Sequence, residues 1–78
     1  MERLEVLKAI ESILQDVLDN EELTITEQTA AEDVEDWDSL ANVQIVVAIQ
    51  KKFGKKFPAQ VILSWKNVGD MINSVIGE

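Results

Sequence analysis

The first apolar positions of the chain follow a helical period. Apolar side chains recur at intervals of three or four residues: Val6, Ile10, Ile13 and Val17, with Leu7, Leu14 and Leu18 beside them. This spacing predicts an amphipathic helix with one buried face. The pair Asp19-Asn20 is a stop signal, so we expect this helix to end there.

Residues 19–38 form a long polar connection before the next apolar run. Connections of this length are uncommon in compact domains and are usually functional or packed by their own side chains. The segment contains four large apolar residues: Leu23, Ile25, Val34 and Trp37. We expect some of them to pin the connection onto the core.

Residues 39–53 give conflicting signals. The run "VQIVVAI" is rich in β-branched side chains, which favour a strand. A helical arrangement instead gives two adjoining apolar faces, formed by Leu40, Val43 and Val47 and by Val46, Ile49 and Phe53. Gly54 then stands where helices commonly end in a glycine. A lone strand would have no obvious partner, so we predict a helix over residues 39–53.

The last third of the chain predicts a short helix and a longer one. Pro58 breaks the chain and pre-sets a new start, and "AQVILSW" over residues 59–65 allows one or two helical turns. Asn67 is placed as an N-cap, with Asp70 three residues on as in a capping box. The expected buried stripe of this helix is Val68, Met71, Ile72, Val75 and Ile76. The prediction is an all-α fold of four helices, with a long first loop and a short third helix, in one domain over residues 1–78.

The composition excludes several kinds of catalytic and metal-binding site. The 78 residues include no cysteine and no histidine, which excludes disulfides, catalytic thiols, thiolate zinc sites and a histidine general base. We therefore expect no catalytic residues and no self-contained enzyme. No segment has the pattern of a signal peptide or the length to span a bilayer. We expect a soluble, cytoplasmic monomer without membrane contact.

Charge is distributed unevenly along the chain. Of the 15 acids, 13 lie in residues 1–38, while five of the seven basic residues follow, so a net charge of −8 conceals an acidic half and a basic half. The acidic half argues against nucleic-acid binding, which needs a basic footprint. The lysines in "KKFGKK" over residues 51–56 read as a solvated helix end.

The loop acids could also attract a divalent cation, because carboxylates are suitable ligands. Their spacing does not match an EF-hand, and we expect a solvated acidic surface with no metal: Asp33, Glu35, Asp36 and Asp38.

Asp38 and Ser39 stand at the predicted start of the second helix. Either side chain suits a helix cap, because its oxygen can accept from a free amide of the first turn. The same helix start suits a phosphate, and a serine there could carry a phosphodiester. Since the chain has no histidine to activate Ser39, such a modification would have to be made by another protein.

At this point the sequence resembles the acyl carrier protein family. The triplet "DSL" over residues 38–40, the run "LANVQIVVAIQKKFGKKFP" after it and "WKNVGDMI" over residues 65–72 match the family pattern without a gap. The resemblance implies a four-helix bundle of acyl-carrier type. It also implies that a phosphopantetheinyl transferase converts Ser39 into a 4′-phosphopantetheine ester with coenzyme A. The thiol of that arm would carry acyl groups as thioesters between loading and processing enzymes of a lipid, fatty-acid or polyketide pathway.

The resemblance also implies roles for residues around Ser39. Asp38 would belong to the surface that the transferase recognises, and Trp65 would lie near the mouth of the acyl cavity. The positions where the arm and partner enzymes pack would be Leu40, Val43, Val47 and Ile62. Each apolar residue has packing within or between helices as its alternative role.

The sequence departs from the family in the second helix. Fatty-acid-type carriers usually have acids on its outer face, whereas the matching positions here are Ala41, Gln44, Gln50, Lys51 and Lys52. We therefore hypothesise a specialised carrier whose partners present apolar or acidic surfaces to a strip of Ala41, Ile45 and Ala48 that ends at Lys52. The usual glycine before the triplet is replaced in "VEDWDSL", where we expect Trp37 to pack the loop end against the bundle.

Two other functions remain open from the sequence. The chain could carry an aminoacyl or peptidyl group, although the glycine-rich signature of peptidyl carriers is absent. It could also be an unmodified helical protein-interaction module that keeps only the fold.

Overall fold

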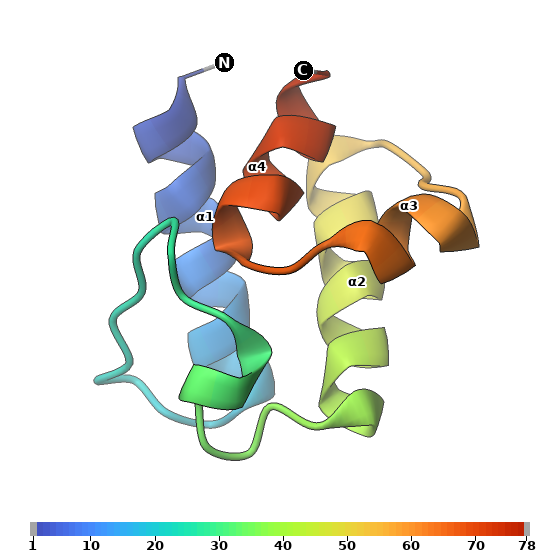
Figure 1. Ribbon diagram of the computed structural model, residues 1–78. Coiled ribbons are helices and arrows are strands. Elements are labelled where there is room, and N and C mark those ends of the chain that lie inside the picture. Colours follow the sequence, from blue (N-terminus) through green and yellow to red (C-terminus); the bar gives the residue numbers. More distant parts are fainter. Residues whose placement is uncertain (1, 78) are drawn as a thin grey trace.

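The computed structural model describes residues 2–77 and consists of helices joined by loops (Figure 1). The elements are α1 (Arg3–Val17), a short 3₁₀ turn η1 (Ala31–Asp33), α2 (Ser39–Phe53), α3 (Ala59–Ser64) and α4 (Val68–Ile76). No strand occurs within residues 2–77. The predicted all-α fold, with its long first loop and short third helix, is confirmed.

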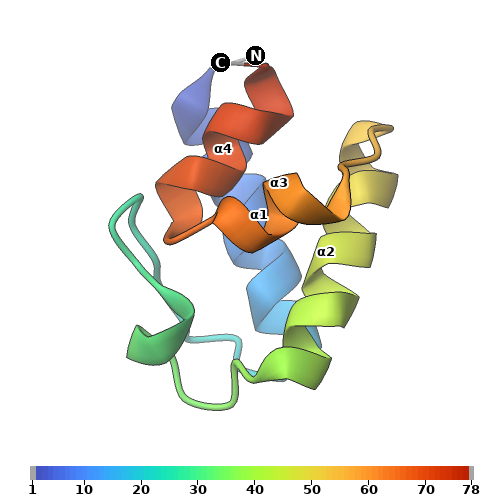
Figure 2. The same cartoon turned by 45° about the vertical axis from the view of Figure 1, so that its right-hand side comes forward.

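α1, α2 and α4 enclose the core, and the short helix α3 lies to one side. α1 packs against both α2 and α4, and α3 contacts α4. α1 and α2 run in opposite directions (Figures 1 and 2), and α3 lies on the side of the molecule away from α1 (Figure 1). None of the helices within residues 2–77 is long and apolar enough to cross a membrane.

α2 has the predicted bounds because both of its ends carry strong local signals. Asp38 caps its start, and Gly54 ends it in the left-handed conformation, at φ 64°. That conformation is strained for residues with a Cβ atom and accessible to glycine. The β-branched run between these ends is helical because packing overrides its weak strand preference.

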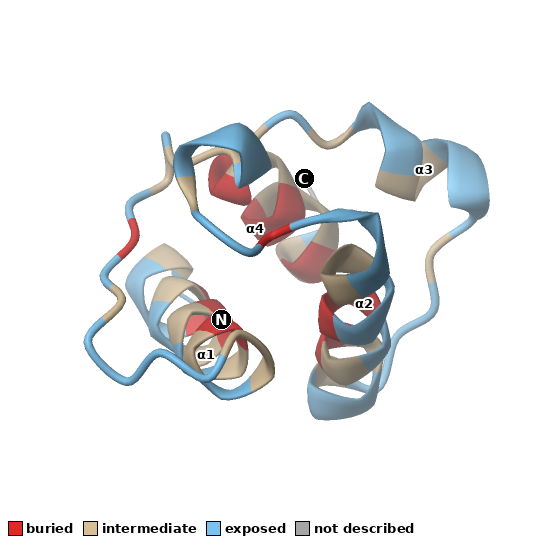
Figure 3. Ribbon diagram, turned by 90° about the horizontal axis from the view of Figure 1, so that it is seen from below, coloured by how far each residue is buried: buried red, intermediate tan, exposed pale blue. Residues whose placement is uncertain are grey.

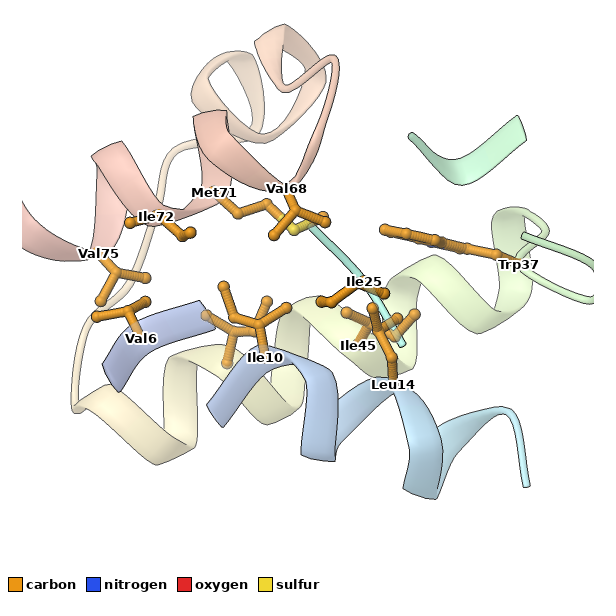
Figure 4. Close-up of a cluster of buried hydrophobic side chains, with 11 residues drawn as sticks. Val6, Ile10, Leu14, Ile25, Trp37, Ile45, Val68, Met71, Ile72 and Val75 are labelled. Atoms are coloured by element: carbon orange, nitrogen blue, oxygen red, sulfur yellow. The ribbon is translucent and has the colours of Figure 1, made fainter. Parts of the chain in front are cut away.

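The core is built from α1, α2, α4 and two loop residues. Figure 3 shows the buried positions on the inward faces of the three long helices, whereas α3 has none. Figure 4 shows most of these side chains meeting between the helices. The cluster consists of Val6, Ile10, Leu14, Ile25, Trp37, Ile45, Ile49, Val68, Met71, Ile72 and Val75.

The structure corrects several predicted positions. Ile45 is completely buried in the core, so it does not belong to an exposed strip with Ala41 and Ala48. α2 is apolar on most sides, and packing against α1 selects the side that contains Ile45 and Ile49. The predicted stripes of α1 and α4 are also narrower than expected: Ile13, Val17 and Ile76 are only partly buried.

The long first loop is fastened to the core, as predicted. Ile25 and Trp37 are buried, and Leu23 and Val34 pack against the cluster in part. The loop also accepts hydrogen bonds from the start of α4, because the amide of Gly69 donates to the carbonyl of Glu27 over 2.8 Å. A Cβ atom at Gly69 would lie 3.1 Å from that carbonyl oxygen, so this close approach favours glycine.

Arg3 links the first loop to both terminal helices. Its guanidinium Nε lies 3.1 Å from a carboxylate oxygen of Glu27, and its Nη1 donates to the side-chain oxygen of Asn73 over 2.6 Å. The hydrogen bond from Arg3 is the main cause that holds the pKa of Glu27 below its ordinary value near 4.5. α1, the loop and α4 are therefore joined by one polar contact network.

Candidate functional site at the start of α2

Asp38, and not Ser39, provides the side-chain cap of α2. Its Oδ1 accepts from the amide of Ala41 over 2.8 Å, and its carbonyl oxygen accepts from the amide of Asn42 over 2.8 Å. Ser39 is the first residue of the helix and is exposed. The capping role is thus filled by its neighbour, which leaves the Ser39 hydroxyl at the surface.

The first turn of α2 also presents backbone donors. The amides of Ser39 and Leu40 have no hydrogen-bond acceptor within residues 2–77. Such amides, together with the positive end of the helix dipole, favour an anion at this position. A phosphate ester on the Ser39 oxygen would lie beside these donors, so the residues present fit a phosphopantetheine attachment.

Trp37 fixes the chain immediately before the Asp-Ser pair. Its side chain is 7% exposed, and its Nε1 donates to the Oδ1 of Asn42 over 3.0 Å. The ring reaches from the loop end toward the core side chains of α4 (Figure 4). The prediction that Trp37 packs the loop end against the bundle is confirmed. Sequence reasoning missed Asn42 as its partner.

A hollow of about 460 Å³ opens beside Ser39, between the loop end, α2 and α3. We call it the Ser39 hollow; its lining residues are Ala31, Glu32, Trp37, Asp38, Ser39, Asn42, Ile62, Leu63 and Trp65. A smaller hollow of about 70 Å³, here called the inner hollow, shares five of these residues and is also lined by Lys66, Asn67 and Met71. This inner hollow is far below the roughly 300 Å³ of typical small-molecule pockets, so a long acyl chain does not fit in this conformation.

Ile62 and Trp65 both line the Ser39 hollow. Trp65 ends α3, and its Nε1 donates to the hydroxyl of Ser74 over 2.8 Å. Its ring stands edge-on to Phe57, with centroids 5.4 Å apart. Trp65 is therefore held by both α4 and the loop before α3.

The outer face of α2 carries three exposed apolar side chains. Leu40, Val43 and Val47 are 70%, 60% and 44% exposed, so they are not core residues. Leu63 on α3 is 84% exposed and also lines the Ser39 hollow. Sequence reasoning missed Leu63. The signal was the apolar triplet Val61-Ile62-Leu63, because a six-residue helix cannot bury every member of it.

The acids of the first loop do not assemble into a cation site. Asp33, Glu35, Asp36 and Asp38 are all exposed. No group of three or more carboxylates, cysteines or histidines that could hold a metal ion occurs within the described residues 2–77.

Comparison with known proteins gives one consistent family. Residues 8–75 match the family described as "Phosphopantetheine attachment site". The meromycolate extension acyl carrier protein of Mycobacterium leprae is 31% identical over 71 residues, which cover 91% of this chain and 62% of that protein. The acyl carrier protein of Thermobifida fusca is 32% identical over 71 residues, which cover 91% of this chain and 90% of that protein.

The fold comparison agrees with the sequence comparison. The solution NMR structure of holo acyl carrier protein from Geobacter metallireducens superposes with a TM-score of 0.85 at 30% identity, covering 92% of this chain and 83% of that one. The chain therefore belongs to the phosphopantetheine-dependent acyl carrier protein family. Covalently attached 4′-phosphopantetheine is its prosthetic group.

Proposed function

We propose that residues 1–78 act as one carrier domain and that Ser39 is the attachment residue. The observation that carries this proposal is the exposed Ser39 hydroxyl at the first position of α2, beside two amides without acceptors and a neighbouring residue that already caps the helix. When attached, phosphopantetheine supplies a thiol that holds an acyl group as a thioester. The chain's own residues then position this group for partner enzymes and perform no catalysis.

The attachment step needs an external enzyme. The Ser39 oxygen bonds to the phosphorus of the phosphopantetheinyl part of coenzyme A, the pyrophosphate bond breaks, and adenosine 3′,5′-bisphosphate leaves. The hydroxyl proton passes to a base of the transferase, because this chain has no histidine to accept it. Asp38 is the proposed recognition residue, since its carboxylate is exposed next to the reacting oxygen.

The residues near Ser39 divide into two proposed groups. Ile62 and Trp65 line the Ser39 hollow and are placed to contact the arm or its acyl group. Leu40, Val43 and Val47 form the exposed face of α2 and are placed to contact enzymes.

The proposed cargo is an acyl group of a specialised lipid or polyketide-type pathway. Two observations support it: α2 has no acidic residue, and one relative is a meromycolate extension carrier. An aminoacyl or peptidyl cargo is the alternative within the same chemistry. Cytoplasmic location and a monomeric state stay predictions.

The test is the intact mass of the protein after incubation with coenzyme A and a broad-specificity phosphopantetheinyl transferase. We expect the mass to rise by one phosphopantetheinyl group in the wild type. Ser39→Ala should lose the gain, and Ser12→Ala, which removes an exposed serine of α1, should keep it. An unchanged wild-type mass with several transferases would leave an unmodified interaction module as the better description.

A further inference from the structure

The inner hollow is lined by three polar side chains from two parts of the fold. Asn42 comes from the first turn of α2, and Lys66 and Asn67 come from the connection between α3 and α4. Both asparagines are half-buried, whereas Lys66 is exposed. The rest of the lining is apolar or aromatic: Ala31, Trp37, Ile62, Trp65 and Met71.

The orientation of both asparagine amides is fixed by a hydrogen-bond donor. The Oδ1 of Asn42 accepts from the indole nitrogen of Trp37 over 3.0 Å. The Oδ1 of Asn67 accepts from the backbone amide of Asp70 over 3.0 Å. Because an indole N–H and a backbone N–H can only donate, the side-chain atom that faces each of them is the oxygen. The group that each asparagine has left over is therefore its NH₂.

These NH₂ groups have no acceptor within residues 2–77. The ammonium group of Lys66 likewise forms no ion pair with any residue that the structure describes. The indole N–H groups of Trp37 and Trp65 are already bonded, to Asn42 and to Ser74. The inner hollow thus presents three unused donor groups, while both of its asparagine oxygens already accept a hydrogen bond.

The size of the inner hollow limits what can occupy it. Its volume of about 70 Å³ has room for only a few non-hydrogen atoms, since one water takes up roughly 30 Å³ in the liquid. An alkyl end in this space would keep the NH₂ groups from water without offering them an acceptor, which costs free energy. An end that carries an oxygen would accept from them instead.

We propose that the inner hollow binds the end of a short acyl group that carries a keto or carboxylate oxygen beyond the thioester, through the NH₂ groups of Asn42 and Asn67. This inference rests on the proposed function and adds the class of cargo. The inner hollow adjoins the Ser39 hollow, because five residues line both. Lys66 adds a positive charge, so a carboxylate is held by a charge-assisted bond and a ketone is not.

The experiment loads Ser39 from acyl-coenzyme A thioesters and follows the side-chain NH₂ resonances of the isotope-labelled protein. The cargo groups are butyryl, acetoacetyl and succinyl, which have the same number of carbon atoms and differ in their oxygens. The chain has four asparagines, so Asn20 and Asn73 serve as internal references. The unloaded holo protein is the starting state, because the arm also offers amide carbonyl oxygens to the same donors.

We expect acetoacetyl and succinyl to shift the NH₂ resonances of Asn42 and Asn67, and butyryl to leave them close to their unloaded positions. The bound population should be about two- to tenfold higher for the oxygenated groups than for butyryl, as one net hydrogen bond provides. Lys66→Gln should reduce the shift caused by succinyl and should preserve the shift caused by acetoacetyl.

Matched variants test the two donors. Asn42→Asp and Asn67→Asp each keep an oxygen for the existing hydrogen bond and remove the NH₂ group. In each variant, loading with acetoacetyl should no longer shift the NH₂ resonance of the remaining asparagine of the hollow. Asn20→Asp makes the same change at an exposed position outside the hollow and should keep both shifts. Circular dichroism checks that all three variants retain their helices.

Three results would overturn the proposal. These are equal shifts with butyryl and acetoacetyl, shifts confined to Asn20 and Asn73, and shifts that appear on attachment of the arm and do not change on loading. All of them leave the mass gain at Ser39, and with it the carrier function, intact.

A failure of the carrier function gives a different result, because the wild type would then gain no mass. In that case N-acetylcysteamine thioesters of acetoacetate and butyrate, added to Ser39→Ala protein, test the hollow alone. Larger shifts at Asn42 and Asn67 with the acetoacetyl thioester would support the binding site, and equal shifts would reject it.

Discussion

The indole nitrogen of Trp37 donates to the side-chain oxygen of Asn42, which lies in the first turn of α2, over 3.0 Å. Trp37 is buried and directly precedes the Asp38 cap. The last loop residues and the first helical turn are therefore joined on both sides of Ser39. The position of the serine depends on this contact as well as on the helix itself.

Asn42→Ala should destabilise the fold by about 1–3 kcal/mol, because the buried indole N–H would lose its acceptor. Urea unfolding measures this loss. Gln44→Ala, at an exposed position of the same helix, is the matched control and should change the free energy of unfolding by less than about 0.5 kcal/mol. Equal effects of the two substitutions would mean that the Trp37–Asn42 hydrogen bond contributes little.

The role of Asp38 as a helix cap can be tested separately from the proposed role of its negative charge. Asp38→Ala should cost about 1 kcal/mol, because the amide of Ala41 loses its acceptor. Asp38→Asn keeps an acceptor oxygen and should cost less, yet it removes the carboxylate proposed for transferase recognition. We expect kcat/KM for phosphopantetheine transfer to fall in both variants. If kcat/KM in Asp38→Asn equalled that of the wild type, the transferase would not recognise the negative charge of Asp38.

The two faces of α2 should respond differently to truncation. Ile45→Ala removes completely buried side-chain atoms and should cost about 2–5 kcal/mol. Val47→Ala shortens a side chain on the exposed face of α2 and should change stability by less than about 0.5 kcal/mol. Thermal or urea unfolding of the two variants measures the difference. A large loss in Val47→Ala would contradict the exposed position of this side chain.

Glu27 should make the stability of the fold depend on pH, and the direction follows from its lowered pKa. Its pKa is lowered in the folded protein by the hydrogen bond from Arg3. The stabilisation is therefore complete above the ordinary pKa near 4.5 and is lost as the pH falls through the lower folded value. Unfolding should be followed from pH 7 to pH 2.5 in wild type and Glu27→Gln. The stability gap between the two proteins should narrow on acidification, and a gap that widened would reverse the assigned sign.

Local sequence signals were sufficient for most of the fold. The N-caps Asp38 and Asn67 accept from amides three residues on, and Gly54 ends α2 as predicted. In a capping box the carboxylate of Asp70 would accept from the amide of the N-cap Asn67. It accepts instead from the amide of Lys66, so the predicted capping box is only half formed. Such signals were readable because both partners lie within four residues of each other.

Contacts between distant parts of the chain were not readable. Arg3 bonds to Asn73 across 70 positions, and no local pattern pairs them. Periodicity also failed to choose the buried side of α2, because Val43, Ile45 and Val47 are all apolar and only packing against α1 distinguishes Ile45. The proposal that Ser39 is the attachment residue came from the family resemblance, whereas the polar contact that fixes the preceding tryptophan required the structure.

Both tryptophans of the chain line the Ser39 hollow, and the chain has no tyrosine. Near-ultraviolet excitation of the protein is consequently emitted almost entirely from Trp37 and Trp65, on either side of the space beside the serine. Emission from a tryptophan responds to the water and polar groups around its ring. Tryptophan emission therefore reports on the space beside Ser39 without an added dye, and a change in emission on loading would support the proposed entry of cargo into this space.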